Sequence, residues 1–340
     1  MSNSRTGLAA VDWRKTWLLA LLLIALFLVA YERFWRAHGF VPSVTDDQAL
    51  WNLARSSVKG DDYNEIVLIG DSQMRENINP SVFAELFNNR KPVQLALDGS
   101  GPLAVLRNLS DDESFKGVVI CDVLSWLFFS ETAGDEQRAE DVVRAYKRPN
   151  ALTYVEKRLR LLVESNFVFS LPELSPASLF RSLRERQLPK PKYNVNLADR
   201  TEYADYTKTD NQKIAQYMLD RVQEKGAGIS EERLQEELKR IEEMVSKIQA
   251  RGGRVIFVVL PTTGAVHAIE EQKYPREKYW DVMAAHTKAI SIYCSDYPSL
   301  SNFNSPDGLH LDYHDAKTFT RNFALIIKDA LNSNGLVNTG

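Results

Sequence analysis

The stretch EIVLIGDSQMRENINP, residues 65 to 80, is an apolar run that ends in Gly-Asp-Ser and then becomes polar. The run is typical of a short buried strand, and Pro80 is typical of the start of a helix. Ser72 would then lie at the carboxyl end of a strand, where α/β folds form their ligand crevices. A serine at this place can act as a nucleophile or simply cap the following helix. The stretch therefore predicts an α/β fold and leaves two roles open for Ser72.

Strand-like and helix-like segments alternate along most of the remaining sequence. Further short apolar strands are predicted at residues 92–101, 117–124, 254–261 and 291–294. Helices are predicted at residues 80–89, 102–109, 275–289 and 313–331. Short, almost wholly apolar strands joined by helices favour a parallel sheet that is covered on both faces. The predicted fold class is therefore α/β, with a parallel sheet flanked by helices in three layers.

Residues 135–250 interrupt this pattern. Helix-like segments at residues 135–165 and 230–251 enclose a polar stretch that contains proline and tyrosine, at residues 170–215. We interpret the region as a helical insertion over the sheet, because insertions at the ligand edge commonly shape a binding cleft. A structural excursion that binds no ligand is the alternative.

The N-terminal part contains a long apolar run, TWLLALLLIALFLVAY, at residues 16–31. At about 1.5 Å per residue the run would extend roughly 24 Å, slightly less than the ~30 Å of a hydrocarbon core. A cleaved signal peptide is the alternative. However, the sequence VAYERFWRAHG at residues 29–39 is bulky and charged and offers no convincing cleavage site of small residues. The run therefore predicts an uncleaved transmembrane anchor.

The charges that flank this run predict its orientation. Basic residues precede it, whereas Glu32 partly offsets Arg33 and Arg36 after it. Because cytoplasmic flanks carry an excess of basic residues, the N-terminus is predicted to lie in the cytoplasm. The predicted organisation is a cytoplasmic segment (1–15), a transmembrane anchor (16–33), a juxtamembrane linker (34–62) and an extracytoplasmic α/β domain (63–334) with its insertion at about 135–250.

The composition argues against some classes of partner and cofactor. The 340-residue chain carries 42 basic and 45 acidic residues in mixed order, for a net charge of −3. No extended positive field is expected, which argues against a nucleic-acid partner. Cys121 and Cys294 lie in apolar strand-like runs and are expected to be buried free thiols, although they could also form a disulfide. Neither zinc-binding spacing nor a histidine cluster occurs, so no metal and no cofactor are predicted.

Ser72 needs a general base to act as a nucleophile, and His310 is the best placed of the five histidines. The sequence NSPDGLHLDYHDA, residues 304–316, puts His310 on a Pro-Gly loop just before the last helix. Asp307 precedes it by three residues. This spacing lets the carboxylate accept the Nδ1 proton of the imidazole and leaves Nε2 as the base. The predicted catalytic residues are Ser72, Asp307 and His310.

The order of these motifs resembles the SGNH (GDSL-like) hydrolase superfamily. IGDS at residues 69–72 is similar to the first conserved block, and DGLHL at 307–311 is similar to the last. LALDGSGP at 95–102 resembles the second block, in which a glycine amide donates to the oxyanion; Gly99 matches better than Gly101. The resemblance covers residues 64–332 and implies the SGNH/flavodoxin-like form of the three-layer fold.

One block departs from the family pattern. The family's third block supplies an asparagine side chain to the oxyanion, but VVICDVLSWLFFS at residues 118–130 contains none. The oxyanion would then rely on the amides of Ser72 and Gly99 or on another donor. Polar residues after Ser72 are candidates for that role, although they also suit exposed turn positions: Arg75, Asn77 and Asn79. Asp122 and Trp126 are candidates for lining the site.

The anchor and the missing block make the chain similar to membrane-associated SGNH-like proteins of cell-envelope polymer modification, such as the alginate O-acetylation proteins and the D-alanine transfer protein of teichoic acids. This resemblance implies acyl transfer to or from the hydroxyls of a polysaccharide through an acyl-serine. It also implies a membrane-bound O-acyltransferase as partner and an inner-membrane protein with a periplasmic domain. A simple esterase and a catalytically silent scaffold that binds glycan or a membrane partner are the alternatives.

Overall fold

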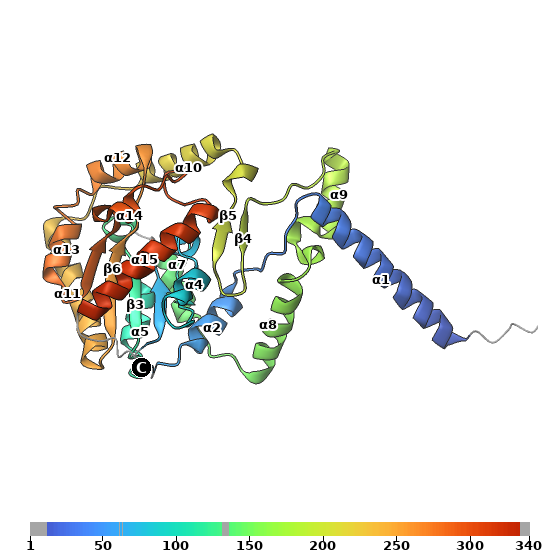
Figure 1. The fold of residues 1–340 in the computed structure, drawn as a ribbon, viewed down its shortest axis with the longest axis horizontal. Coiled ribbons are helices and arrows are strands. Elements are labelled where there is room, and N and C mark those ends of the chain that lie inside the picture. Colours follow the sequence, from blue (N-terminus) through green and yellow to red (C-terminus); the bar gives the residue numbers. More distant parts are fainter. Residues whose placement is uncertain (1–11, 61, 63, 131–135, 334–340) are drawn as a thin grey trace, which may run out of the picture. The chain divides into compact units, whose positions relative to one another are not determined.

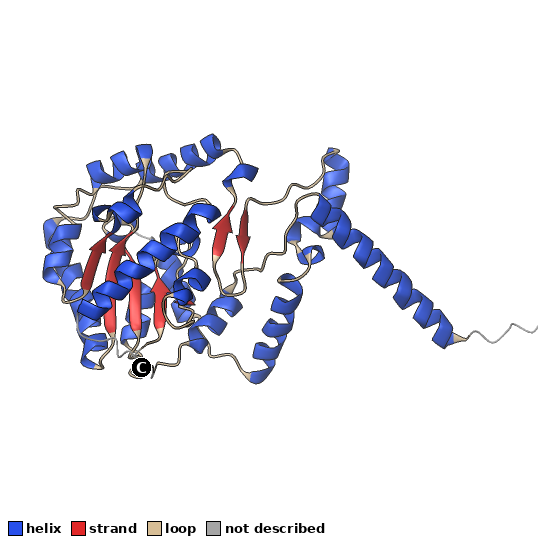
Figure 2. Ribbon diagram, in the orientation of Figure 1, coloured by secondary structure: helices blue, strands red, loops and turns tan. Residues whose placement is uncertain are grey.

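The computed structural model describes residues 12–60, 62, 64–130 and 136–333, which form two compact units. The larger unit contains residues 44–161 and those from 193 onward. The smaller unit contains the chain up to residue 43 together with residues 162–192. Figure 1 labels the elements, and Figure 2 separates helices from strands by colour.

The larger unit is built on a parallel sheet of five strands. The strands are β1 (Ile66–Ile69), β2 (Val93–Gln94), β3 (Val118–Asp122), β6 (Arg254–Val259) and β7 (Ile290–Tyr293), in the order β2-β1-β3-β6-β7. Every neighbouring pair is parallel. The α/β fold class and the parallel sheet are therefore confirmed. The strand order changes direction between β1 and β3, and crevices for ligands form at such a point.

Helices cover both faces of the sheet because alternate strand residues point to opposite sides. Val67 and Ile69 belong to the core shared with α5 (Leu103–Ser110) and α11 (Glu231–Ala250). Ile66 and Leu68 belong to the core shared with α4 (Pro80–Glu85) and α15 (Tyr313–Ser333). Figure 1 shows α15 crossing its face of the sheet. Every residue of β1 is buried, which explains its wholly apolar sequence.

Shorter elements complete these two layers. On the face of α5 and α11 they are α6 (Ser125–Phe128), α7 (Gln137–Arg144), α10 (Asn211–Glu224), α12 (Gly264–Lys273) and α13 (Trp280–His286). On the face of α15 they are α3 (Ser72–Glu76), η4 (Cys294–Asp296) and α14 (Pro298–Ser301). Cys121 and Cys294 are both buried free thiols, as expected from the sequence.

The helix α11 corrects the predicted limits of the insertion. Its residues Leu234, Leu238, Ile241, Val245 and Ile248 are buried, and they join the core between the sheet and α5. The helix thus packs on one face of the sheet and leads into β6, as a crossover helix of a parallel sheet does. The prediction that the insertion extends to about residue 250 is therefore wrong at its C-terminal end.

The predicted juxtamembrane linker also contains part of the α/β unit. Residues 48–57 form α2 (Gln48–Ser57), capped by the Asp47 carboxylate, which accepts from the Leu50 amide at 2.9 Å. Trp51 is 1% exposed and its indole Nε1 donates to the Leu95 carbonyl at 3.2 Å. From about residue 44 onward, the segment belongs to the larger unit.

A small antiparallel hairpin lies in the region between β3 and β6. It consists of β4 (Asn194–Asn196) and β5 (Glu202–Ala204), and η3 (Tyr206–Lys208) follows it. Arg200, in the hairpin turn, is 1% exposed. Its guanidinium donates to the carbonyls of Gln94 at 2.9 Å and Ala96 at 3.0 Å, and it pairs with Asp46 at 2.7 Å. These contacts hold the hairpin beside β2, the edge strand of the sheet.

The smaller unit contains α1 (Trp13–Ala37), η1 (Val168–Ser170), η2 (Pro172–Leu174) and α9 (Pro176–Glu185). Its core is formed by Trp35, Phe40, Val168, Leu171 and Leu174. By length and composition, α1 could cross a membrane, and it extends beyond both ends of the predicted anchor. The predicted cytoplasmic segment lies mostly outside the described residues. The helix α8 (Ala151–Glu164) contains the boundary between the two units.

Candidate active site

The turn after β1 settles which residue caps the following helix. The Asp71 carboxylate accepts from the Gln73 amide at 2.8 Å and is the N-cap of α3. Ser72 is therefore the first residue of the helix, and its hydroxyl is not used as a cap. Gly70, with a φ of 148°, passes so close to β3 that an added Cβ would lie 2.5 Å from Asp122 Cβ. The turn thus requires glycine at this position.

Ser72, His310 and Asp307 are joined by hydrogen bonds. The distance from His310 Nε2 to Ser72 Oγ is 2.8 Å, and the distance from His310 Nδ1 to Asp307 Oδ2 is also 2.8 Å. The other carboxylate oxygen, Oδ1, accepts from the amides of Leu309 at 2.9 Å and His310 at 2.7 Å. The geometry is that of a nucleophile, a base and a group that orients the base.

The pKa of Asp307 is lowered to about 2. Burial acts to raise it, but the His310 imidazole and the backbone amides that donate to the carboxylate outweigh burial. Asp307 is therefore ionised at any pH near neutrality. Its charge fixes the proton on Nδ1 and leaves Nε2 directed at the Ser72 hydroxyl.

Tyr206 adds a fourth donor to the Asp307 carboxylate. Its hydroxyl donates to Oδ2 at 2.8 Å, and the side chain is 4% exposed. Tyr206 belongs to η3, in the region between β3 and β6. The sequence did not indicate this residue, because nothing in the local pattern distinguishes it from the other tyrosines of the polar stretch. The insertion therefore contributes directly to the position of Asp307.

Two amide side chains fix the histidine loop to α3. Gln73 Nε2 donates to the Leu309 carbonyl at 3.0 Å. Asn77 Oδ1 accepts from the Leu311 amide at 2.8 Å, and its Nδ2 donates to the Leu309 carbonyl at 3.3 Å. Asn77 is fully buried, so the alternative expectation of an exposed turn residue is wrong. Its amide is engaged in positioning the loop. Asn79 instead caps α4, accepting from the Ser81 amide at 3.0 Å.

Arg75 is also buried, at 1% exposure, rather than exposed on a turn. Its guanidinium forms an ion pair with Asp98, and it lies 3.2 Å from Asp46 and 3.5 Å from Glu202. It also donates to Asn196 Oδ1 at 2.6 Å. These contacts engage Arg75 in an internal network that holds the Asp98 turn against α3.

The turns that contain Gly99 and Ser72 both start from one backbone hydrogen bond. The Leu97 amide donates to the Gly70 carbonyl at 2.9 Å. Leu97 comes two residues before Gly99, and Gly70 comes two residues before Ser72. Gly99 has a φ of 65°, which glycine adopts readily. Arg221, on α10, places Nη2 3.3 Å from the position that a Cβ on Gly99 would occupy. The sequence did not indicate Arg221 as a neighbour of this turn, because it lies far from Gly99 along the chain.

The structure places Asp122 behind the turn rather than on a free surface. Asp122 is 1% exposed, and burial together with the Asp71 carboxylate raises its pKa well above the usual range. Trp126 is 4% exposed and belongs to the core on the α11 side. Neither residue offers much side-chain area to a ligand. Residues 123–130, which follow β3 directly, contain no asparagine.

A second carboxylate lies near the base. Glu76 Oε1 is 3.7 Å from His310 Nε2, and Glu76 follows Ser72 by one helical turn. Burial raises the pKa of Glu76, and the charges of Glu202 and Asp307 raise it further against the effect of His310. Burial lowers the pKa of His310, but the Glu76 and Asp307 carboxylates outweigh burial, so the net shift is upward. Glu76 therefore favours the protonated imidazole.

In any reaction in which His310 accepts the Ser72 proton, such as ester hydrolysis, the Glu76→Gln variant is expected to be active at lower pH than the wild type. His310 must be neutral to accept the Ser72 proton, so a raised imidazole pKa restricts activity to higher pH. Removal of a charge this close should lower that pKa by about 1 to 3 units. The rising limb of ester hydrolysis against pH should move to lower pH by a similar amount. Glu85→Gln, at an exposed surface pair, is the control. An unmoved limb in Glu76→Gln would contradict this account of the base.

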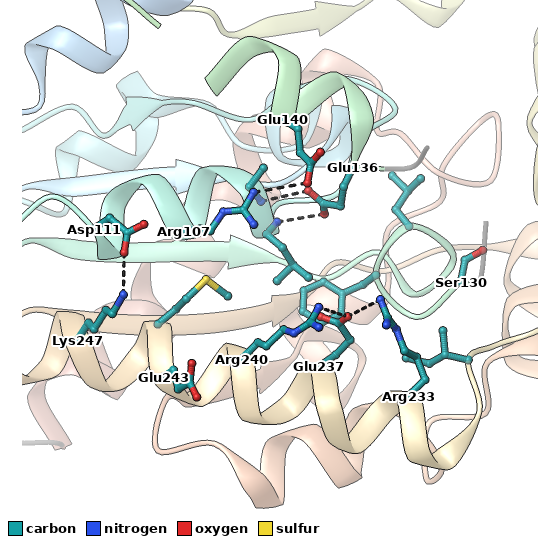
Figure 3. Close-up of a pocket in the computed structure, with 16 residues that line it drawn as sticks. Arg107, Asp111, Ser130, Glu136, Glu140, Arg233, Glu237, Arg240, Glu243 and Lys247 are labelled. Carbon is teal, nitrogen blue, oxygen red and sulfur yellow. Dashed lines mark hydrogen bonds and ion pairs between the residues drawn. The ribbon is translucent and has the colours of Figure 1, made fainter. Parts of the chain in front are cut away.

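A separate cavity of about 830 Å³ lies among α5, α7 and α11 (Figure 3). Its charged side chains pair with one another: Asp111 with Lys247 at 2.8 Å, Glu237 with Arg233 at 2.9 Å and with Arg240 at 3.1 Å. Glu136 accepts from the amides of Leu103 and Ala104, both at 3.1 Å, and so caps α5. None of the triad residues lines this cavity. Among the described residues, no group of three or more His, Cys, Asp or Glu could hold a metal ion.

The chain matches no protein-family model, and no curated protein is significantly similar to it in sequence.

Proposed function

We propose that this chain is a membrane-anchored serine acyltransferase or esterase of the SGNH type. It would act on the O-acyl groups of an extracytoplasmic polysaccharide, with O-acetyl as the proposed acyl group. The observation that carries the proposal is the hydrogen-bonded series Ser72, His310 and Asp307, with 2.8 Å at both links. Its position at the carboxyl ends of β1 and its neighbours agrees with a ligand crevice of a parallel sheet.

In the first half of the proposed reaction, His310 Nε2 takes the proton from Ser72 Oγ as the oxygen attacks the acyl carbonyl. The imidazolium that forms is stabilised by Asp307, which Tyr206 and two backbone amides hold in place. Collapse of the tetrahedral intermediate breaks the bond to the leaving alcohol, and His310 gives the proton to that oxygen. The product is an acyl-serine and a free hydroxyl.

In the second half, His310 takes a proton from water or from a sugar hydroxyl, and the resulting oxygen nucleophile attacks the acyl-serine. Collapse of the second tetrahedral intermediate breaks the bond to Ser72 Oγ, and His310 returns the proton to that oxygen. Attack by water makes the protein an esterase, and attack by a sugar makes it a transferase. The oxyanion would be bound by the amides of Ser72 and Gly99. The Arg221 guanidinium beside Gly99 would supply the additional donor that the missing asparagine provides in the family.

The polysaccharide, the periplasmic location and a membrane-bound O-acyltransferase partner rest on the resemblance of the motifs, together with the apolar helix α1. A silent scaffold remains the second candidate, because no asparagine follows β3. Loss of one oxyanion donor costs an enzyme roughly a hundredfold or more in rate. A scaffold catalyses nothing and needs no such donor.

A fluorophosphonate probe tests the proposal on the full chain in detergent. The Ser72 oxygen should bond to phosphorus as fluoride leaves, while His310 takes the proton. We expect one phosphonyl group per chain at Ser72, measured by mass spectrometry, and no labelling in Ser72→Ala or His310→Ala. His314→Ala, an exposed histidine four residues further on, is the matched control and should label normally. Absence of labelling in the wild type would favour the scaffold.

A further inference from the structure

Two contacts align residues 168–174 of the smaller unit with the end of the apolar run of α1. The Tyr31 hydroxyl donates to the Leu174 carbonyl at 2.9 Å. The Glu32 carboxylate accepts from the Val168 amide at 2.9 Å. Since the uncharged run ends at Tyr31, residues 168–174 lie at the level where α1 changes from apolar to charged. In a membrane-spanning α1, that level is the boundary between acyl chains and headgroups.

The helix α9 begins two residues after this segment, with Ser175 as its cap. On one side of it, Leu179 packs against the core of the unit. Next to Leu179, Phe180 is 73% exposed and Leu183 is 77% exposed. At about 100° per residue these three side chains form an apolar arc of roughly 100°, and only one edge of it is covered within the unit. Two large apolar side chains therefore face outward close to the polar boundary of α1.

The same segment is strongly basic. Residues 176–192 contain five basic side chains, Arg181, Arg184, Arg186, Lys190 and Lys192, and a single acidic one, Glu185. All of them are exposed. Lys192 pairs with Glu173 at 2.6 Å, which leaves an excess of positive charge on the rest of the segment. Exposed apolar residues flanked by arginines are typical of helices that lie in the interface of an anionic membrane.

We propose that residues 176–192 bind the surface of the bilayer that α1 crosses. Phe180 and Leu183 would enter the boundary of the acyl chains, and the neighbouring basic side chains would contact anionic headgroups. The lipid surface fits better than a protein partner for two reasons: the segment lies level with the polar boundary of α1, and its charge is complementary to anionic lipid. The inference depends on α1 spanning a membrane and not on the proposed chemistry. The protein would thus hold the membrane at two places.

A dye on the outward face of α9 tests this directly. The full chain carrying Leu183→Cys is labelled with an environment-sensitive dye and reconstituted into phosphatidylcholine and phosphatidylglycerol vesicles. The native thiols of Cys121 and Cys294 are buried and should not react. Nitroxide groups on the lipids should quench the dye severalfold more strongly at position 183 than in the control Glu185→Cys, on the polar face of the same helix. Equal, weak quenching with water-like emission at both positions would overturn the proposal, and would leave the face to a protein partner.

Charge provides the second arm of the test. Arg181→Gln combined with Arg184→Gln, in the chain labelled at position 183, removes two cations near the headgroups. Each basic residue near an anionic surface contributes a similar amount to the free energy of membrane binding. Loss of two should therefore lower the ratio of membrane-bound to free α9, measured as quenched to unquenched dye, about thirtyfold in phosphatidylglycerol vesicles. It should also fall when phosphatidylglycerol is omitted. Quenching that depends neither on the lipid nor on the arginines would show that the proposed headgroup contacts are wrong.

Discussion

Replacement of Ser72 by alanine is expected to reduce ester hydrolysis by a factor on the order of 10⁴ or more. The physical reason is that His310 would have no hydroxyl to deprotonate, and no acyl-enzyme could form. The measurement is the hydrolysis of p-nitrophenyl acetate by the full chain in detergent. His310→Ala should lose a similar factor, and the double variant should lose little more, because the two residues act as a unit.

The stability of Ser72→Ala is the control for this prediction. Asp71 and not Ser72 caps α3, so removal of the Ser72 hydroxyl should leave the helix intact. We expect thermal unfolding of the variant to resemble that of the wild type. Hydrolysis retained by a folded Ser72→Ala would rule out the serine as the nucleophile. If Ser72→Ala also unfolds, the deciding measurement is the hydrolysis by His310→Ala, provided that its thermal unfolding resembles that of the wild type.

Replacement of Arg75 by alanine should lower the free energy of unfolding by about 3 to 5 kcal/mol. The guanidinium is 1% exposed and pairs with three carboxylates, those of Asp98, Asp46 and Glu202. Of these three carboxylates, Asp46 keeps its pair with Arg200, whereas Asp98 and the buried Glu202 lose their cationic partner. The three carboxylates belong to three different segments, so the Asp98 turn and the β4–β5 hairpin should both loosen. Urea unfolding of the full chain measures the change.

Arg321→Ala is the matched control for Arg75→Ala. Arg321 pairs with Glu85 at 3.1 Å, and both side chains are more than half exposed, at 51% and 56%. Such surface pairs contribute up to about 1 kcal/mol, so this variant should unfold almost like the wild type. Equal effects of the two substitutions would show that burial of the Arg75 network does not determine its contribution.

The sequence was most informative where a local pattern determines the structure. The apolar run before Ser72 predicted β1, because a strand buried on both faces must be apolar throughout. The spacing of Asp307 and His310 predicted their contact, since a tight turn joins residues three apart. The alternation of strands and helices predicted the parallel sheet. Each of these features depends on residues that lie close together in the chain.

Other parts of the site depend on contacts that no local pattern contains. Tyr206 and Arg221 come from the region between β3 and β6, more than a hundred residues from the turns that they contact. Arg75 and Asn77 were interpreted as candidates for binding or as exposed turn residues, because their burial depends on the hairpin and on the histidine loop. The assignment of α11 to the insertion was wrong for a related reason. Its core-facing residues are interrupted by many charged ones, and only packing shows which layer it joins.

The hairpin turn has a consequence for the behaviour of the protein in solution. An edge strand with free carbonyls can pair with the edge of another molecule, which is a common route to aggregation. Here the edge strand β2 is only two residues long, and the guanidinium of Arg200 occupies the carbonyls of Gln94 and Ala96. A charged side chain at this position cannot continue a ladder of strands. Arg200 thus disfavours pairing of the β2 edge with another molecule, in addition to holding the hairpin in place.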